Sequence, residues 1–268
     1  MPRGKHSPYS AVSPVYGCIA PGNAIELLPV MTEATHALIV TPHPDDVESR
    51  MGGTVARWTH EGKGVVYVVC TSGDKGTSDP DMKPQELARI REQEQLAAAE
   101  ILGLKEVIFL RYPDQGLEDT PEFRKELVRS IRTYRPDIVV AVDSYGRYRD
   151  HRDHRIAMRV TLDAVFPYAA TTHAYPDLLE QGLQPHMVKE VLICGPQEPN
   201  YYLDITDTID IKIAALRCHK SQVGDGPRAA EWMQQWAKRS AEGQDYELGE
   251  AFHREEITWY RPFQTSWL

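Results

Sequence analysis

Short apolar runs rich in β-branched residues alternate with helix-like segments along most of this chain. Continuous runs of this kind are typical of strands that are covered on both faces of a sheet. The repeated order of strand and helix predicts an α/β fold: a Rossmann-like, doubly wound, mostly parallel sheet with helices on both faces. The expected strands are 37–41, 65–70, 107–111, 138–142 and 188–194, with 201–205 as a further candidate, and the expected helices are 53–60, 84–102, 121–134 and 154–166.

Several helix ends carry their own signals. Gly103 is a typical stop for the helix before it, and Thr120 followed by Pro121 is typical of an N-cap with proline at the first helical position. Further helices are expected at 206–222 and 228–242. The second of these carries Trp232 and Trp236 four residues apart, a spacing that more often marks a face docked on the core than a cofactor site.

The length of 268 residues suits one large α/β domain with appendages. We expect an N-terminal arm at 1–30, an α/β domain at 31–225, and a C-terminal helical extension at 226–268 that packs on the same domain. The four cysteines are widely spaced and form no C-x-x-C pair, which favours free thiols over a cysteine-built metal site.

Charge and hydropathy exclude several classes of partner. The net charge of −9 argues against nucleic acid or an anionic membrane as the main partner, because both require a basic face. An apolar run of about eighteen residues, which a membrane-spanning helix requires, is missing from the sequence. The first residues also lack the apolar core of a secretion signal, so we expect a cytoplasmic protein.

The first cluster of chemistry-bearing residues follows the strand expected at 37–41. His43, Asp45 and Asp46 stand at the carboxyl end of that strand, where open α/β sheets place their ligands. His43 and Asp46 can supply the imidazole and the carboxylate that zinc accepts, and Asp45 then remains as a general base for an activated water. The alternative is a simple turn in which Asp46 caps the next helix. The glycine pair at 52–53 fits either close approach to a ligand or tight packing.

The second cluster is the segment from His151 to His154, about a hundred residues further along the chain. Two histidines three apart share a face if they begin a helix, so that one can bind a metal while the other faces a substrate carbonyl. Asp153 or Asp150 could orient an imidazole ring by accepting its N–H. The run 147–155 also holds four arginines, which fit either a solvated, charged helix start or a clamp for a polar substrate.

Taken together, these motifs resemble those of the PIG-L/LmbE-like zinc-dependent N-deacetylases, which hydrolyse the N-acetyl group of N-acetylglucosamine-containing compounds. The resemblance covers about residues 35 to 225. Its motifs are Pro42-His43-Pro44-Asp45-Asp46 with Gly52-Gly53-Thr54, the Thr71–Gly76 segment, the helix with Arg91 and Glu94, the Tyr112–Gly116 element, His151-Arg152-Asp153-His154, and His219-Lys220-Ser221-Gln222.

The resemblance implies roles for particular residues. His43, Asp46 and His154 would be the zinc ligands, with Fe²⁺ as a possible occupant of the same site. Asp45 would be the general base, and a protonated His151 would stabilise the oxyanion. Arg91, Asp74 and Asp114 stand where the family contacts the sugar, and His219 belongs to the late motif.

We therefore expect a zinc-dependent hydrolase that acts on a small N-acetylated amino sugar or conjugate, with no nucleic-acid or membrane partner and with assembly into a homo-oligomer. A zinc amidase that cleaves a larger sugar or thiol conjugate would use the same residues. A non-catalytic sugar-binding homologue is the remaining alternative, although five intact site residues argue against it. A serine-hydrolase G-x-S-x-G motif is not found in the sequence.

Overall fold

The computed structural model describes residues 35–143, 151–224 and 228–257. The expected N-terminal arm and Asp150 lie outside these residues. The sheet has seven strands in the order β3-β2-β1-β4-β5-β7-β6. The strands are β1 (Thr35–Thr41), β2 (Gly64–Thr71), β3 (Glu106–Tyr112), β4 (Ile138–Val142), β5 (Glu190–Cys194), β6 (Tyr201–Asp204) and β7 (Gly249–Glu256).

The first five strands are parallel, whereas β7 runs antiparallel to both β5 and β6. The order 3-2-1-4-5 is that of a doubly wound sheet, which confirms the expected fold class. The described helices are α1 (Asp46–His60), α2 (Pro84–Leu102), α3 (Pro121–Tyr134), α4 (Arg152–Asp163), α5 (Pro176–Glu180), α6 (Ile209–Leu216), α7 (Lys220–Val223) and α8 (Arg228–Ser240), with a π-helical segment η1 (Ala164–Ala169) after α4.

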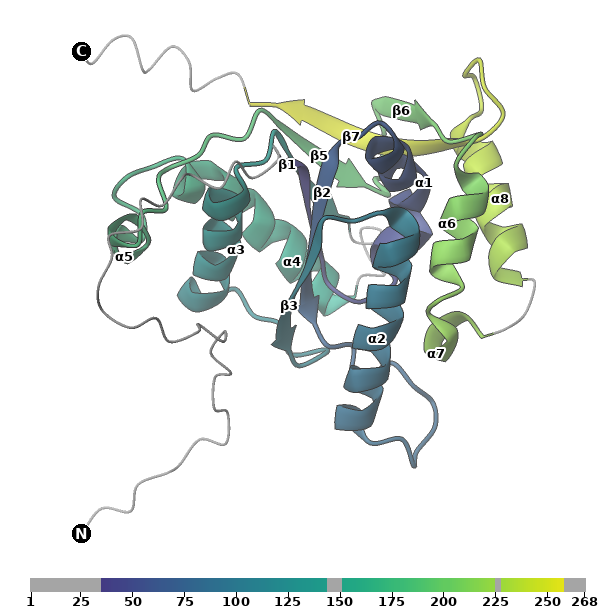
Figure 1. Ribbon diagram of the computed structural model, residues 1–268, viewed down its shortest axis with the longest axis horizontal. Coiled ribbons are helices and arrows are strands. Elements are labelled where there is room, and N and C mark those ends of the chain that lie inside the picture. Colours follow the sequence, from purple (N-terminus) through teal and green to yellow (C-terminus); the bar gives the residue numbers. More distant parts are fainter. Residues whose placement is uncertain (1–34, 144–150, 225–227, 258–268) are drawn as a thin grey trace, which may run out of the picture. The chain divides into compact units, whose positions relative to one another are not determined.

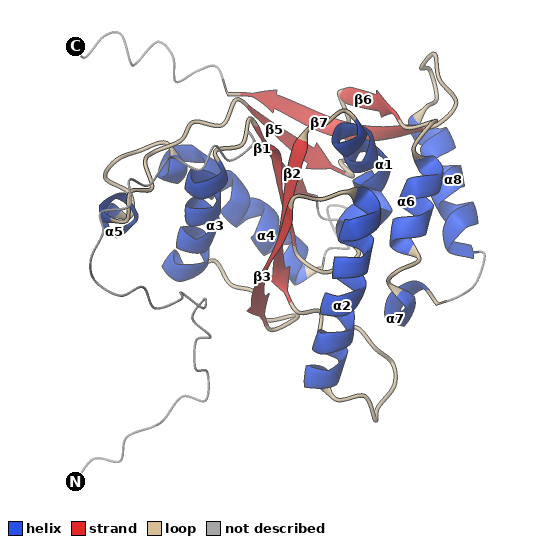
Figure 2. Ribbon diagram, viewed as in Figure 1, coloured by secondary structure: helices blue, strands red, loops and turns tan. Residues whose placement is uncertain are grey.

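Side chains alternate between the two faces of the parallel strands, and each face has its own core. On one face Leu38 and Val40 of β1 join a cluster with residues of α3 and α4. On the other face Ala37 and Ile39 join a cluster with residues of α1 and α2. Helices therefore cover both faces of the sheet, and α6 and α8 add a further layer beyond α1 (Figures 1 and 2).

Two helices have the bounds expected from the sequence, and their end signals work as expected. The hydroxyl of Thr120 accepts the N–H of Phe123 at the start of α3. Gly103 has a φ of 69° at the end of α2, in the left-handed region where a glycine has no steric penalty. Local sequence signals are therefore sufficient to place both helices.

Other boundaries differ from the expectation. Helix α1 begins at Asp46 rather than at residue 53, with a break at Met51, whose φ of −141° is not helical. The segment 206–222 forms two short helices rather than one. Beyond α8, the segment expected to be a helical extension contains β7, a strand that the sequence analysis did not predict.

Within the described residues, a helix with both the length and the apolar character needed to cross a bilayer is not found. Cys70 and Cys194 are buried free thiols and Cys218 is a partly buried one, as expected for three of the four cysteines.

Candidate metal centre and active site

The site lies where the order of the sheet reverses. Strands β1 and β4 are neighbours, and the chain leaves them toward opposite faces of the sheet. His43 follows β1, and His154 lies in the first turn of α4, which follows β4. A crevice forms at this point in doubly wound sheets, because adjacent connections turn away from each other.

The turn after β1 holds Asp45 in a strained conformation. Its φ is 93°, a value that is uncommon for residues other than glycine. The neighbouring backbone is fixed from α2: the guanidinium of Arg91 donates to the carbonyl of Pro44 at 2.6 Å, and the N–H of Asp45 donates to Oε1 of Gln95 at 3.3 Å. Strain of this kind persists only where the surrounding structure enforces it, and it is concentrated at functional sites.

Three side chains form a compact set of metal donors. Oδ2 of Asp46 lies 3.2 Å from Nδ1 of His43 and 3.3 Å from Nε2 of His154. All three donor atoms lie within 4.8 Å of one another, and all three residues are buried. Asp46 is the first residue of α1 and does not cap it, so the simple-turn alternative does not describe this cluster.

The other ring nitrogen of His43 faces two more carboxylates. Nε2 lies 3.2 Å from Oδ1 of Asp114 and 3.3 Å from Oδ2 of Asp153. Asp153 also accepts the backbone N–H groups of Gln115 and Leu117, which keep its carboxylate in place. An N–H from His43 to a carboxylate is the usual arrangement behind a metal-binding histidine, because it fixes the tautomer and the ring orientation.

The charges around His43 favour a cation at the centre. Burial opposes a charged imidazole, but the hydrogen bonds with Asp114, Asp153 and Asp46 raise the pKa of His43 well above its ordinary value. Burial likewise opposes ionisation of Asp46, but the positive charge of His154 and the hydrogen bonds with both histidines lower its pKa well below the usual range. A buried group of carboxylates is stable only with compensating positive charge.

The pKa of Asp45 is shifted in the opposite direction from that of Asp46. Burial and the negative charge of Asp46 raise the pKa of Asp45 to about 7, although Arg91, 3.4 Å from its carboxylate, partly offsets this effect. Its side chain is 22% exposed, so it remains accessible from outside the cluster. Two adjacent aspartates thus differ in basicity as expected for a metal ligand and a general base.

His151 stands at the N-cap of α4, with its ring centroid 4.7 Å from that of His43. Its Nδ1 accepts the backbone N–H of Asp153 at 3.2 Å, so a neutral ring would carry its proton on Nε2. Burial and the positive charge of His43 lower the pKa of His151. This environment favours a neutral imidazole that donates from Nε2, whereas the sequence analysis expected a protonated ring.

The residues expected to contact the sugar are mostly occupied by protein groups. Arg91 is 3% exposed and bonds to the loops on both sides of it, including the carbonyl of Gly73. Asp114 is buried against His43, and Asp74 accepts the backbone N–H of Asp114. His219 is fully buried. In this conformation Arg91 and His219 are buried and support the site, whereas Asp74 is partly exposed and holds the backbone of Asp114.

The sequence analysis did not include Glu48 and Gln95 in the site, although both support it. Glu48 is fully buried, 3.5 Å from Nε2 of His219, and it accepts a hydrogen bond from Gln95 at 2.8 Å. The signal was present in α2, where Arg91 and Gln95 interrupt an otherwise apolar stripe one helical turn apart. Polar residues on a buried stripe need partners, and the partners here lie in the turn after β1, at Gly73 and in α1.

Comparisons with known proteins identify the family. The family model described as GlcNAc-PI de-N-acetylase, PIG-L, matches residues 38–165. Diacetylchitobiose deacetylase of Thermococcus kodakarensis is 40% identical over 185 residues, which cover 69% of this chain and 69% of that protein. The 1D-myo-inositol 2-acetamido-2-deoxy-alpha-D-glucopyranoside deacetylase of Rhodococcus erythropolis is 30% identical, with 74% of this chain and 85% of that protein covered.

The fold is also that of a solved relative. The N,N'-diacetylchitobiose deacetylase of Pyrococcus horikoshii, solved with an inhibitor, superposes with a TM-score of 0.78 at 31% identity. The match covers 86% of this chain and 89% of that one. With its fold, its clustered motifs and these relatives, the chain belongs to the PIG-L/LmbE-like N-deacetylase family.

Proposed function

We propose that this protein is a zinc-dependent hydrolase that removes the N-acetyl group from a small N-acetylglucosamine-containing molecule. The observation that carries the proposal is the convergence of His43, Asp46 and His154 beside the basic and accessible carboxylate of Asp45. Relatives named as deacetylases of diacetylchitobiose and of an N-acetylglucosaminyl inositol support the substrate class.

The donor set fits a divalent cation. Two imidazoles and one carboxylate are the protein ligands of many catalytic zinc sites, and they leave a coordination position open. Fe²⁺ accepts the same ligands. The contact between Nε2 of His43 and Asp153 leaves Nδ1 of His43 for the cation, next to Oδ2 of Asp46. A cation held there would lower the pKa of water and polarise the acyl carbonyl.

Asp45 would carry the proton transfers of the reaction. Its carboxylate takes a proton from the attacking water as the water oxygen forms a bond to the acyl carbon. When the C–N bond breaks, the same proton passes to the departing nitrogen. The products are acetate and a free amine. Arg91 and Gln95 would position this carboxylate through the backbone of its loop.

His151 would stabilise the negative charge that develops on the acyl oxygen. A hydrogen bond donated from its Nε2 toward that oxygen strengthens as the charge forms, and a single donor of this kind contributes about 3–4 kcal/mol in other hydrolases. Asp114, 3.9 Å from Nε2 of His151, would help to orient the ring before substrate binds.

A second candidate is cleavage of a larger amide conjugate by the same groups. Mycothiol S-conjugate amidase of Streptomyces coelicolor is 32% identical, with 55% of this chain and 57% of that protein covered. Its name describes an amidase that acts on a conjugate, so a relative of this chain cleaves an amide other than a simple N-acetyl group. The two candidates differ in substrate rather than in chemistry.

The test measures the release of acetate and of free amine from N-acetylglucosamine, N,N'-diacetylchitobiose and a larger amide conjugate of a glucosamine-containing compound. We expect acetate from at least one N-acetylated sugar, loss of activity after chelation, and recovery on addition of Zn²⁺. Cleavage of the conjugate alone would support the amidase. A protein that binds no divalent metal and hydrolyses none of these compounds would overturn the proposal.

A further inference from the structure

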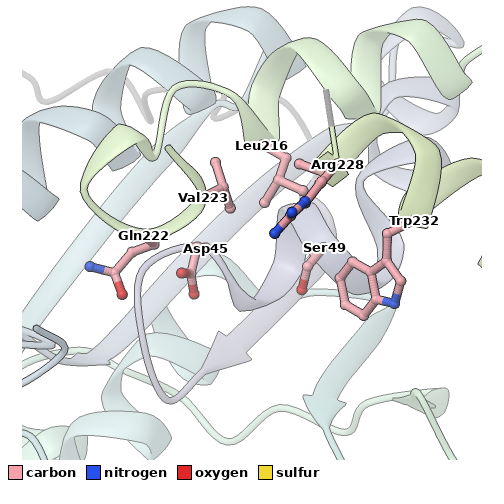
Figure 3. A pocket seen from close by; sticks show the side chains of 8 residues that line it. Asp45, Ser49, Leu216, Gln222, Val223, Arg228 and Trp232 are labelled. Atoms are coloured by element: carbon pink, nitrogen blue, oxygen red, sulfur yellow. The ribbon is translucent and has the colours of Figure 1, made fainter. Parts of the chain in front are cut away.

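A cavity of about 440 Å³ lies beside Asp45, and His43, Asp46 and His154 are not among its lining residues. It is bounded by the first turn of α1, the end of α6, and helices α7 and α8 (Figure 3). The lining residues are Asp45, Ser49, Leu216, Gln222, Val223, Arg228, Ala229 and Trp232. Asp45, the candidate general base, therefore lies at the inner end of the cavity, and α8 forms its outer wall.

The cavity is larger than the catalytic step requires. An acetyl group has only a few atoms, whereas this volume lies within the range of about 300–1,000 Å³ that is typical of sites for whole small molecules. The part of a substrate beyond the scissile amide can therefore occupy it. An amide held at Asp45 would place the amide-bearing ring at the inner end and any group attached to that ring farther out.

Trp232 places an exposed aromatic ring at the outer end of the cavity. The sequence analysis favoured a core role for this residue, but α8 buries Met233 and Ala237 instead, and the Trp232 side chain remains 41% exposed. The indole of Trp236 packs against it at 4.8 Å between ring centroids, which limits the freedom of the Trp232 ring. A fixed, exposed aromatic ring at the mouth of a cavity costs little conformational entropy when it binds a ligand.

Polar groups beside Trp232 indicate what the ligand is. Arg228 lies one helical turn before Trp232, and its guanidinium extends toward the middle of the lining groups (Figure 3). Gln222 lines the opposite side near Asp45. A pyranose ring has a C–H face that packs on an indole and hydroxyl groups at its edge that bond to such side chains.

Other occupants fit less well. A lipid chain would leave the guanidinium of Arg228 without a polar partner from the ligand. An anionic group would meet the carboxylate of Asp45 as well as Arg228, so the lining provides no net positive charge. A second sugar ring satisfies both the aromatic and the polar parts of the wall.

We propose that this cavity is an outer saccharide subsite, in which Trp232 packs against a second pyranose ring linked to the ring that carries the N-acetyl group. The inference rests on the proposed deacetylase function and narrows its substrates to glycosidically extended N-acetylglucosamine. It makes Trp232 a determinant of substrate length rather than of the chemical step.

The test compares a disaccharide with a monosaccharide. Acetate release from N,N'-diacetylchitobiose and from N-acetylglucosamine is measured for the wild type, Trp232→Ala and Trp232→Phe. Gln235→Ala serves as the control, because Gln235 is exposed on α8 outside the cavity. We expect Trp232→Ala to lower kcat/KM for the disaccharide about five- to tenfold. The value for the monosaccharide should change less than about twofold, and Trp232→Phe should retain most of the preference.

An equal loss on both substrates, or no loss on either, would overturn the subsite. Failure of the deacetylase function is recognised separately, because the wild type would then release no acetate from either sugar. In that case calorimetric titration with N,N'-diacetylchitobiose tests the subsite by measuring the binding affinity directly. Weaker binding to Trp232→Ala than to the wild type and Gln235→Ala would support it, and equal affinities, or no binding to any of the three, would overturn it.

Discussion

Adjacent aspartates with different basicity are the central feature at the scale of single residues. Asp46 lies between two imidazoles, which stabilise its ionised form, while Asp45 is turned away by its left-handed backbone toward Arg91. The same dipeptide can therefore supply a metal ligand and a proton acceptor. The backbone conformation, rather than the side-chain type, separates the two roles.

Substitution of Asp45 by Asn should remove the base and leave the metal donors in place. We expect kcat to fall by about 10²–10⁴-fold, the usual contribution of a general base. The zinc content, measured on the same purified sample, should stay equal to that of the wild type. Turnover near the wild-type rate in a zinc-loaded variant would remove Asp45 from this role.

The pH profile should show the ionisation of the same group. A base must be deprotonated to act, and the pKa of Asp45 is raised to about 7, so kcat/KM should increase with pH through an acid limb. Because a bound cation stabilises the carboxylate, the apparent pKa of the loaded enzyme should lie at or below this value. A profile of kcat/KM that stays flat between about pH 4 and pH 8 would contradict this assignment.

At the scale of elements, α1 depends on contacts from the far end of the chain. The break at Met51 leaves the N–H groups of Gly53 and Thr54 facing Glu250 of β7, whose carboxylate accepts both at 3.1 and 2.7 Å. Glu250 also binds the buried ammonium of Lys212 in α6 at 2.6 Å. One carboxylate thus caps the second part of α1 and joins it to α6 and β7.

Replacement of Glu250 by Ala should be strongly destabilising, because it leaves the Lys212 charge buried without its partner. Breaking a buried pair in this way costs about 3–5 kcal/mol in the free energy of unfolding. The double variant Glu250→Ala/Lys212→Met should be more stable than Glu250→Ala alone. Denaturant unfolding of both variants measures the difference, and a double variant that is no more stable would contradict the importance of the unpaired charge.

Gly53 permits the close contact between α1 and Ile205, which lies in the segment between β6 and α6. A Cβ atom at this position would lie 2.8–2.9 Å from three carbon atoms of Ile205, just before α6. A Cβ atom at Gly52 would lie 3.1 Å from its nearest neighbour, Cγ of Lys212. The side chain of Lys212 is longer than that of Ile205. Tight packing is therefore sufficient to explain Gly53.

We expect Gly53→Ala to lower the free energy of unfolding by about 1–3 kcal/mol, as overpacked core positions do. Gly52→Ala is the matched control and should cost less, because the Lys212 stem can move by a few tenths of an ångström. Thermal unfolding compares the two. Equal stabilities of both variants would show that Ile205 can move aside at little cost, and would contradict this explanation of Gly53.

For the protein as a whole, the metal centre would connect elements that are distant in sequence. His43 and Asp46 lie between β1 and α1, while His154 belongs to α4 on the opposite face of the sheet. A cation bound to all three stabilises only the folded state, in which these elements meet. Metal binding should therefore increase global stability as well as activity.

Removal of the metal should lower the Tm by several degrees. At a free metal concentration of a hundred times Kd, binding contributes about 2.7 kcal/mol, and each kcal/mol corresponds to roughly 2–4 °C for a chain of this size. Differential scanning calorimetry with and without a chelator measures the shift. Asp46→Asn should show a much smaller response, and an unchanged Tm in the chelated wild type would contradict the metal centre.

Much of this molecule could be predicted from local sequence. Continuous β-branched runs identified strands β1 to β5, and caps such as Thr120 and Gly103 placed α2 and α3, because these signals act between neighbouring residues. Strand β7 was missed because Gly249–Glu256 is mostly polar and is stabilised by pairing with β5 and β6. The exposed position of Trp232 depends equally on distant packing.

The sequence by itself determined the doubly wound fold class and identified the residues that we propose to carry the chemistry, because strand and helix periodicity and motif chemistry are local properties. Only the tertiary structure decided the orientation, the burial and the contacts of those residues. It directed one nitrogen of His43 toward Asp46 and the other toward Asp153, buried Arg91 behind Asp45, and left Trp232 at the mouth of a cavity. These arrangements arise from contacts between segments far apart in the chain, which local patterns do not encode.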